Sequence, residues 1–111
     1  VSRWTGVLDA TRFGYAAHSH RFSSPLGLLK RQMQDEDCLT LNVCAPAAPA
    51  GPRLPVLVFI HGGGYFEGTS ALPVHDPKPL VAKFGILLVT INYRLGGLGF
   101  VDFSQYSTDF E

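Results

Sequence analysis

The stretch "PVLVFIHGGGYFEG", residues 55–68, sets an apolar run directly before three consecutive glycines and two aromatic residues. The run "PVLVFI" is apolar at every position and rich in β-branched side chains, which is typical of a strand covered on both faces. A second run of this kind, "GILLVTI", occupies residues 85–91. The two runs predict central, parallel strands of an α/β fold, with the glycines at the end of the first strand.

Two segments have the character of helices. "DPKPLVAKF", residues 76–84, lies between the two apolar runs and carries Pro77 and Pro79 where the first turn of a helix tolerates proline. It is therefore predicted to be the crossover helix that joins the parallel strands. "SSPLGLLKRQMQ", residues 23–34, is a weaker candidate for a second helix, because Gly27 disfavours the helical conformation.

A third strand is predicted ahead of the first apolar run. "CLTLNVC", residues 38–44, alternates Leu39, Leu41 and Val43 with polar residues. This period of two indicates a strand with its apolar face buried. "APAAPAGPRLP", residues 45–55, then predicts an exposed connection, since alternating alanine and proline exclude a helix.

Composition limits the class of protein. The 111 residues are 46% hydrophobic and 16% charged, with nine basic and nine acidic side chains. This balance disfavours disorder and a nucleic-acid-binding protein with a strongly basic surface. No apolar stretch reaches the ~20 residues of a membrane span, and "VSRWTGVLDA" lacks the layout of a secretory signal.

The predicted elements do not add up to a complete domain. Two strands covered on both faces need helical layers above and below the sheet, and one good helix cannot supply them. Long hydrophobic strands with open edges would also aggregate. Residues 1–111 are therefore expected to form part of a larger α/β domain.

The glycine loop invites a comparison with phosphate-binding loops. The P-loop ends in Gly-Lys-Ser/Thr, whereas Gly68 is followed directly by Thr69 and no lysine is present. The dinucleotide pattern G-x-G-x-x-G fails as well, because Glu67 occupies the position of the third glycine. Phosphate binding is thus disfavoured.

Two interpretations of the glycines are left. A simple turn would use glycine to relieve positive-φ strain, but three in a row exceed what one turn needs. An oxyanion hole uses successive backbone N–H groups, unobstructed by side chains, to bind the oxygen that becomes negative when an ester carbonyl is attacked. An HGGG motif after a strand is typical of this element in lipases and esterases. In this interpretation His61 shapes the loop and is not the catalytic base.

Four motifs together resemble the type B carboxylesterases, the family that includes the cholinesterases. They are "WTGVLDATRFG" (4–14), "EDCLTLNVCAP" (36–46), "LPVLVFIHGGGYFEG" (54–68) and "VTINYRLGGLGF" (89–100). They occur in the order found in the family and are spread along the chain from residue 4 to residue 100.

The resemblance implies an α/β-hydrolase fold with a twisted, mostly parallel central sheet, of which residues 1–111 would be the amino-proximal part. It also implies hydrolysis of a small carboxylic ester through an acyl-enzyme. By position, Gly63 and Gly64 would be the oxyanion donors on this loop, with Gly62 opening the turn. Such chemistry requires no metal or organic cofactor.

The sequence departs from the family at two places. No serine stands in a G-x-S-x-G elbow, so the nucleophile and its acid and base partners are expected outside these residues, and the fragment alone is expected to be inactive. Ser70 and Ser104 are interpreted as loop hydroxyls. In secreted relatives the counterpart of Cys38 forms a disulfide, but Ala16 and Ala17 occupy the region of its partner, which favours a bacterial-type or intracellular esterase.

A second class of function stays open. Some relatives keep this fold as catalytically silent, cholinesterase-like binding or adhesion proteins. The intact HGGG favours the enzyme, and the presence of a downstream serine elbow distinguishes the two.

The remaining polar and aromatic residues receive structural interpretations. Cys38 and Cys44 are predicted to be free thiols, because along one strand they lie too far apart to pair. A metal site is disfavoured for the two nearby histidines, a structural ion pair is expected at the acidic pair, and the two aromatics after the glycines are expected to pack and to line the pocket. These residues are His18 and His20, Glu36 and Asp37, and Tyr65 and Phe66.

Overall fold

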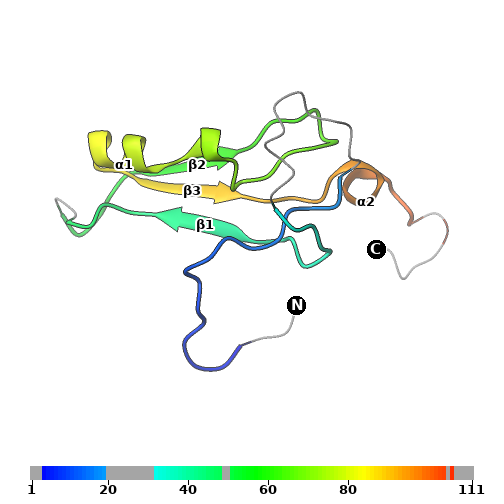
Figure 1. Ribbon diagram of the computed structural model, residues 1–111, viewed down its shortest axis with the longest axis horizontal. Coiled ribbons are helices and arrows are strands. Elements are labelled where there is room, and N and C mark those ends of the chain that lie inside the picture. Colours follow the sequence, from blue (N-terminus) through cyan, green and yellow to red (C-terminus); the bar gives the residue numbers. More distant parts are fainter. Residues whose placement is uncertain (1–3, 20–31, 49–50, 105, 107–111) are drawn as a thin grey trace.

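The computed structural model describes residues 4–19, 32–48, 51–104 and 106. Its regular elements follow one another along the chain as shown in Figure 1. They are β1 (Leu41–Cys44), β2 (Val56–Ile60), the 3-10 helix η2 (Pro73–His75), α1 (Lys78–Phe84), β3 (Leu87–Ile91) and α2 (Gly96–Phe100).

The three strands form one sheet in the order β1-β3-β2. β2 and β3 run parallel, with Val56 opposite Leu87 and Ile60 opposite Ile91, as the two apolar runs predicted. β1 pairs with β3 in the antiparallel direction. The described part of the chain is therefore a small α/β arrangement with a mixed sheet. The expectation of parallel strands holds for one of its two pairings.

The predicted crossover helix is confirmed as α1, which lies between β2 and β3 in the chain. Its N-cap is Pro77, and the Asp76 carboxylate accepts a hydrogen bond from the Lys78 N–H at 3.1 Å. The helix ends at Gly85, whose φ of 62° is left-handed and whose N–H donates to the Val81 carbonyl. Glycine is favoured here because a side chain in this conformation is strained.

The predicted strand forms as β1, but the apolar face that was predicted to be buried is exposed. The strand forms, but Leu41 and Val43 are 58% and 59% exposed. Asn42 is the better covered residue, and its side-chain amide donates to the hydroxyls of Ser70 at 2.9 Å and Thr90 at 3.0 Å. The polar face of β1 is therefore held by hydrogen bonds, while its apolar side chains Leu41 and Val43 are exposed.

The face of the sheet that carries Leu41 and Val43 is exposed or half-buried across all three strands. Alternation and register place side chains from all three strands on it: Leu41, Val43, Val56, Val58, Ile60, Leu87, Val89 and Ile91. Five of them are at least 55% exposed, and none of the eight is fully buried. On the opposite face Leu88 and Thr90 are buried, and the His75 ring of η2 packs on Phe59 at 4.8 Å. The apolar runs are thus only covered on one side.

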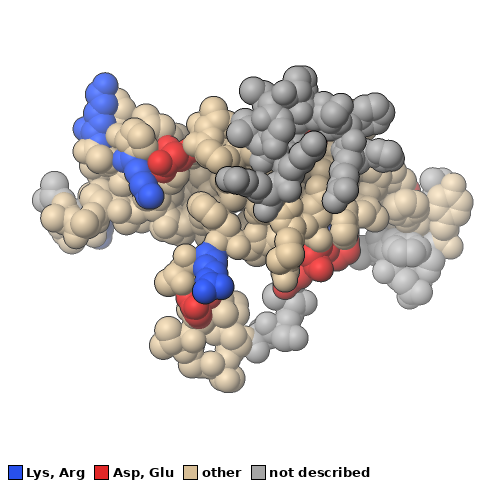
Figure 2. All heavy atoms as spheres, in the orientation of Figure 1, with Lys and Arg blue, Asp and Glu red and all other residues tan. Residues whose placement is uncertain are grey.

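The second predicted helix cannot be compared with the structure over most of its length. The candidate helix at 23–34 falls mainly outside the described residues, and the described Gln34 forms an isolated parallel bridge with Ala16. In the described ranges no helix has the length and hydropathy to cross a bilayer. On the face drawn in Figure 2, charged side chains of both signs lie in small separate groups.

Candidate active site

The glycine loop and α2 lie at the same end of the sheet. The loop follows the carboxyl end of β2, and α2 follows the carboxyl end of β3 (Figure 1). In α/β folds this edge of parallel strands is where ligands bind. Here it holds an open hollow of about 360 Å³, lined by Ile60, His61, Gly62, Gly63, Gly64, Tyr65 and Tyr93.

The backbone of the loop explains why the sequence needs several glycines. Gly63, Gly64 and Gly68 have φ values of 130°, 60° and 124°, all in the region that disfavours side chains. Tyr65 adopts a φ of 67° without being glycine. Its carbonyl accepts a 2.7 Å hydrogen bond from the Gly96 N–H, which helps to hold this unusual conformation.

Space as well as conformation requires glycine at two of these positions. A Cβ at Gly63 would overlap the carbonyl of Glu67, and a Cβ at Gly68 would overlap the His61 ring and the Gly62 carbonyl. A Cβ at Gly64 would instead meet a single atom, of the Phe66 ring, at 3.8 Å. Glycine is therefore favoured at position 64 by its φ alone, whereas Gly63 and Gly68 are required by both conformation and space.

Two carbonyl groups at the start of the loop are held by side chains. The Tyr93 hydroxyl donates to the His61 carbonyl at 2.7 Å. The Nδ1 of His61 lies 2.9 Å from the Gly62 carbonyl. Because that oxygen can only accept, Nδ1 must carry the proton. The neutral ring is thus the Nδ1–H tautomer.

A third carbonyl is held by the loop itself. The Gly63 carbonyl accepts hydrogen bonds from the N–H groups of Phe66 at 3.1 Å and Glu67 at 3.2 Å. No described residue accepts a hydrogen bond from the N–H of Gly63 or Gly64, and both residues are exposed. Among the described residues, the loop therefore offers backbone donors without an acceptor, next to three carbonyl groups that are held by hydrogen bonds.

His61 is buried beneath this loop. Its ring stacks on that of Tyr93, with centroids 4.4 Å apart and an angle of 13° between the planes. Burial lowers the pKa of His61, because the charged imidazolium loses its hydration. A neutral ring used to hold a backbone carbonyl agrees with the prediction that His61 shapes the loop.

The far end of the loop is anchored by a buried polar cluster around Asn92. The Asn92 carbonyl oxygen accepts from the Ser70 N–H at 2.8 Å, and its amide donates to the Tyr15 carbonyl at 3.0 Å. The hydroxyl of Thr69, which is 1% exposed, donates to the side chain of Gln32 at 2.8 Å. Ser70 lies in the loop, where its N–H donates to Asn92 and its hydroxyl accepts from Asn42, in agreement with its interpretation as a loop hydroxyl.

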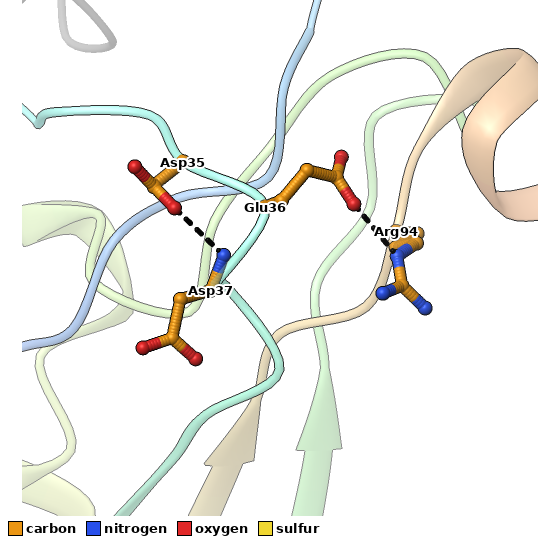
Figure 3. A network of polar contacts seen from close by, with 4 residues as sticks. All are labelled: Asp35, Glu36, Asp37 and Arg94. Atoms are coloured by element: carbon orange, nitrogen blue, oxygen red, sulfur yellow. Dashed lines mark hydrogen bonds and ion pairs between the residues drawn. The ribbon is translucent and has the colours of Figure 1, made fainter. Parts of the chain in front are cut away.

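The acidic pair near β1 contributes an ion pair. Glu36 accepts a 3.2 Å hydrogen bond from the guanidinium of Arg94, and both side chains are roughly half exposed (Figure 3). The neighbouring Asp35 carboxylate accepts from the Asp37 N–H at 2.9 Å. A structural ion pair was predicted here, and Arg94 is the partner that sequence reasoning did not name.

The other candidate residues have structural positions. Cys38 and Cys44 are both free, as predicted. Cys38 lies in one buried cluster with Ala17 and Leu95, and burial raises the pKa of its thiol. The described residues hold no group of three His, Cys, Asp or Glu side chains able to bind a metal. His20 lies outside the described residues.

The two aromatic residues after the glycines, Tyr65 and Phe66, differ in their surroundings. Tyr65 lines the hollow, and its ring meets that of Phe100 edge-on at 4.9 Å. Phe66 is not among the lining residues and is 72% exposed. The prediction that both line the pocket therefore holds for Tyr65 alone.

Sequence reasoning missed Tyr93 and Asn92 as residues of this region. Both belong to "VTINYRLGGLGF", one of the four motifs that resemble the family. They directly follow β3. Asn92 bonds Ser70 and Tyr15, whereas Tyr93 bonds His61. The sequence did contain a signal for them: β2 and β3 were predicted to be parallel, so residues directly after β3 should lie beside the glycine loop that follows β2.

The carboxylesterase family profile matches residues 1–109. The chain belongs to the carboxylesterase family. Its membership agrees with the resemblance found in the four motifs and with the placement of the glycine loop at the strand ends.

This chain is similar in sequence to two esterases and a hydrolase. The para-nitrobenzyl esterase of Bacillus subtilis (strain 168) is 39% identical over 104 residues, which cover 94% of this chain and 21% of the relative. The phenmedipham hydrolase of Pseudarthrobacter oxydans is 44% identical over 101 residues, covering 88% and 20%. The acetylcholinesterase of Electrophorus electricus is 36% identical over 104 residues, covering 88% and 16%.

Solved carboxylesterase structures have the same arrangement. The structure of a thermophilic PNB esterase superposes with a TM-score of 0.86 at 38% identity, over 97% of this chain and 22% of that one. A further PNB esterase superposes with a TM-score of 0.82 at 37% identity, over 97% and 21%. The chain thus spans about a fifth of the length of the relatives it matches.

Proposed function

We propose that the whole protein is a serine carboxylesterase and that the loop described above supplies part of its oxyanion hole. The observation that carries the proposal is the pair of exposed N–H groups at Gly63 and Gly64, which donate to no described residue, on a loop where the carbonyl groups of His61, Gly62 and Gly63 are held in place. In a member of the carboxylesterase family, such donors fit the oxygen of an ester under attack.

The proposed reaction divides its chemistry between this loop and residues outside it. A serine in a G-x-S-x-G elbow attacks the ester carbonyl while a histidine takes the hydroxyl proton, and an acidic residue orients that histidine. The carbonyl oxygen becomes negative and is bound by the N–H groups of Gly63 and Gly64. The N–H after the nucleophile completes the hole. Loss of the alcohol leaves an acyl-enzyme, which water then hydrolyses.

Gly64→Pro in the whole protein tests the assignment. Proline removes the donor and cannot adopt the φ of 60° found at this position. We expect kcat for a chromogenic aryl ester to fall by ~10² to 10³-fold, the usual cost of one oxyanion donor. Gly51→Ala is the matched control, because a Cβ there meets nothing within 4 Å.

The result can also separate the enzyme from a binding homologue. An unchanged kcat in Gly64→Pro would remove the loop from catalysis. A wild-type protein that neither hydrolyses esters nor reacts with a fluorophosphonate would lack a working nucleophile, which would favour the catalytically silent alternative.

A further inference from the structure

The glycine loop contains three successive peptide groups whose carbonyl oxygens each accept a hydrogen bond. In a trans peptide the C=O of one residue and the N–H of the next share a plane and point in opposite directions. Holding a carbonyl therefore sets the direction of the following N–H. The carbonyls of His61, Gly62 and Gly63 are the ones held, so the N–H groups that are set belong to Gly62, Gly63 and Gly64.

The donors to these carbonyls differ in origin. Phe66 and Glu67 hold the Gly63 carbonyl from within the loop. Tyr93 comes from the segment after β3, 32 residues away in the chain, and holds the His61 carbonyl through its hydroxyl. Its ring also stacks on the His61 ring, which in turn holds the Gly62 carbonyl. Two of the three peptide groups thus depend on Tyr93.

We propose that Tyr93 is a positioning residue of the oxyanion hole. Its hydroxyl fixes the peptide group between His61 and Gly62, where the loop begins. Its ring supports the stacked His61 ring, which holds the Gly62 carbonyl and so sets the direction of the Gly63 N–H. This inference rests on the proposed function of the loop. Preorganised donors stabilise a developing negative charge because they need no reorientation during the reaction. A loosened peptide would lose part of this effect without losing the substrate-binding surface.

The state of the Tyr93 hydroxyl suits this task. Burial raises its pKa above the usual 10, so the phenol keeps its proton throughout the pH range of ester hydrolysis. A neutral phenol is both the donor that the His61 carbonyl needs and a ring that stacks without charge.

Tyr93→Phe in the whole protein separates positioning from packing, because it removes the hydroxyl and keeps the ring. We expect kcat to fall about 10-fold at an unchanged KM, less than the ~10²-fold loss of a whole donor. Titration with a fluorophosphonate counts the competent active sites, so that kcat is expressed per folded enzyme. Tyr106→Phe is the control, since Tyr106 is 76% exposed and distant in the chain from the loop.

A second measurement does not depend on activity. Hydrogen exchange of the peptide that spans residues 61–68 reports on the Phe66 and Glu67 N–H groups, which are bonded to the Gly63 carbonyl. We expect faster exchange there in Tyr93→Phe, with exchange in β3 unchanged. In a protein that hydrolyses no ester, the proposed function fails while this comparison still tests the hold of Tyr93 on the loop.

The outcomes are distinct. A lower kcat per active site together with faster local exchange supports the proposal. Wild-type kcat and wild-type exchange in Tyr93→Phe overturn it. A lower melting temperature with full activity per titrated site also overturns it, because Tyr93 would then act through stability alone. If Tyr93→Phe does not fold, Tyr93→Trp keeps a stacking ring without the hydroxyl and is judged by the same two measurements.

Discussion

The imidazole of His61 is buried against a stacked phenol, and burial disfavours a second proton on the ring. Burial is the main cause of its lowered pKa, and the nearby His75 acts in the same direction. The hydrogen bond to the Gly62 carbonyl opposes both. At neutral pH the ring is therefore a neutral part of the loop, with its one proton engaged.

The pKa of His61 gives a prediction for stability against pH. Below the ordinary value of 6.5 the unfolded chain binds a proton that the folded chain resists. The free energy of unfolding should therefore fall as pH decreases from 6.5 toward the lower folded-state pKa, and this contribution is constant above 6.5. Urea unfolding of the whole protein at pH 5 to 8 measures the slope.

The control for this slope is a pair of glutamine variants. His61→Gln should flatten the dependence in this pH window, whereas His18→Gln, at an exposed position, should leave it unchanged. An equal slope in the wild type and His61→Gln would show that His61 is not the group responsible.

At the scale of single residues, sequence patterns predicted roles within the loop and missed its external supports. Three adjacent glycines after a strand indicated unusual backbone conformations, and Gly63 and Gly64 have them. The supports from Tyr93 and Asn92 join residues 32 and 22 positions apart. Contacts of that kind depend on strand pairing and have no local periodicity that could reveal them.

α2 is the element that propensity would least predict. Its five residues, "GGLGF", include three glycines, which disfavour a helix. Tertiary contacts hold it instead: the Gly96 N–H donates to the Tyr65 carbonyl, and Gly99 lies so close to Arg94 that a Cβ would overlap the Arg94 carbonyl. Close backbone approach thus outweighs propensity, and α2 packs beside the glycine loop.

Alanine at two positions of α2 should have opposite effects. A Cβ at Gly97 would meet Val101 at an ordinary 3.7 Å, so Gly97→Ala should stabilise the protein by about 0.5–1 kcal/mol through a lower unfolded-state entropy. Gly99→Ala should destabilise it by about 1–3 kcal/mol, because the backbone must move. Urea unfolding of the two whole-protein variants compares them directly. Equal effects would contradict the packing of Gly99 on Arg94.

Among the longer elements, hydrophobic patterning predicted most of what forms. The two apolar runs became β2 and β3, and the proline-led segment became α1. Patterning identified β1 but not the covering of its faces, since the layer over Leu41 and Val43 is not supplied by the described residues. It had no means of finding α2, whose residues carry no helical signal.

The molecule as a whole is broad and thin, with extents of 52 × 39 × 23 Å. Its radius of gyration is 16.4 Å, whereas a compact domain of this length would have about 13 Å. The buried apolar residues of the described part are few, and they include no aromatic side chain: Ala16, Ala17, Cys38, Val81, Leu88 and Leu95. We propose that residues 1–111 are the amino-proximal part of a larger carboxylesterase domain, whose other segments cover the open sheet face.

This proposal predicts the behaviour of residues 1–111 expressed alone. An uncovered apolar face and open strand edges should cause self-association and strong binding of a hydrophobic dye, without a cooperative unfolding transition. Sedimentation velocity and urea titration measure these properties. A monomer that melts cooperatively would instead identify these residues as an independent domain.

The anchors of the glycine loop have a consequence for the order in which the protein is made. The contacts that hold the carbonyls of His61 and Tyr65 from outside the loop come from Tyr93 and Gly96, which lie downstream of it. Synthesis proceeds from the amino end, so the glycines leave the ribosome before their supports exist. The shape that suits the loop to catalysis is therefore acquired late, when β3 joins the sheet, and a nascent chain paused between the two would carry the motif without its geometry.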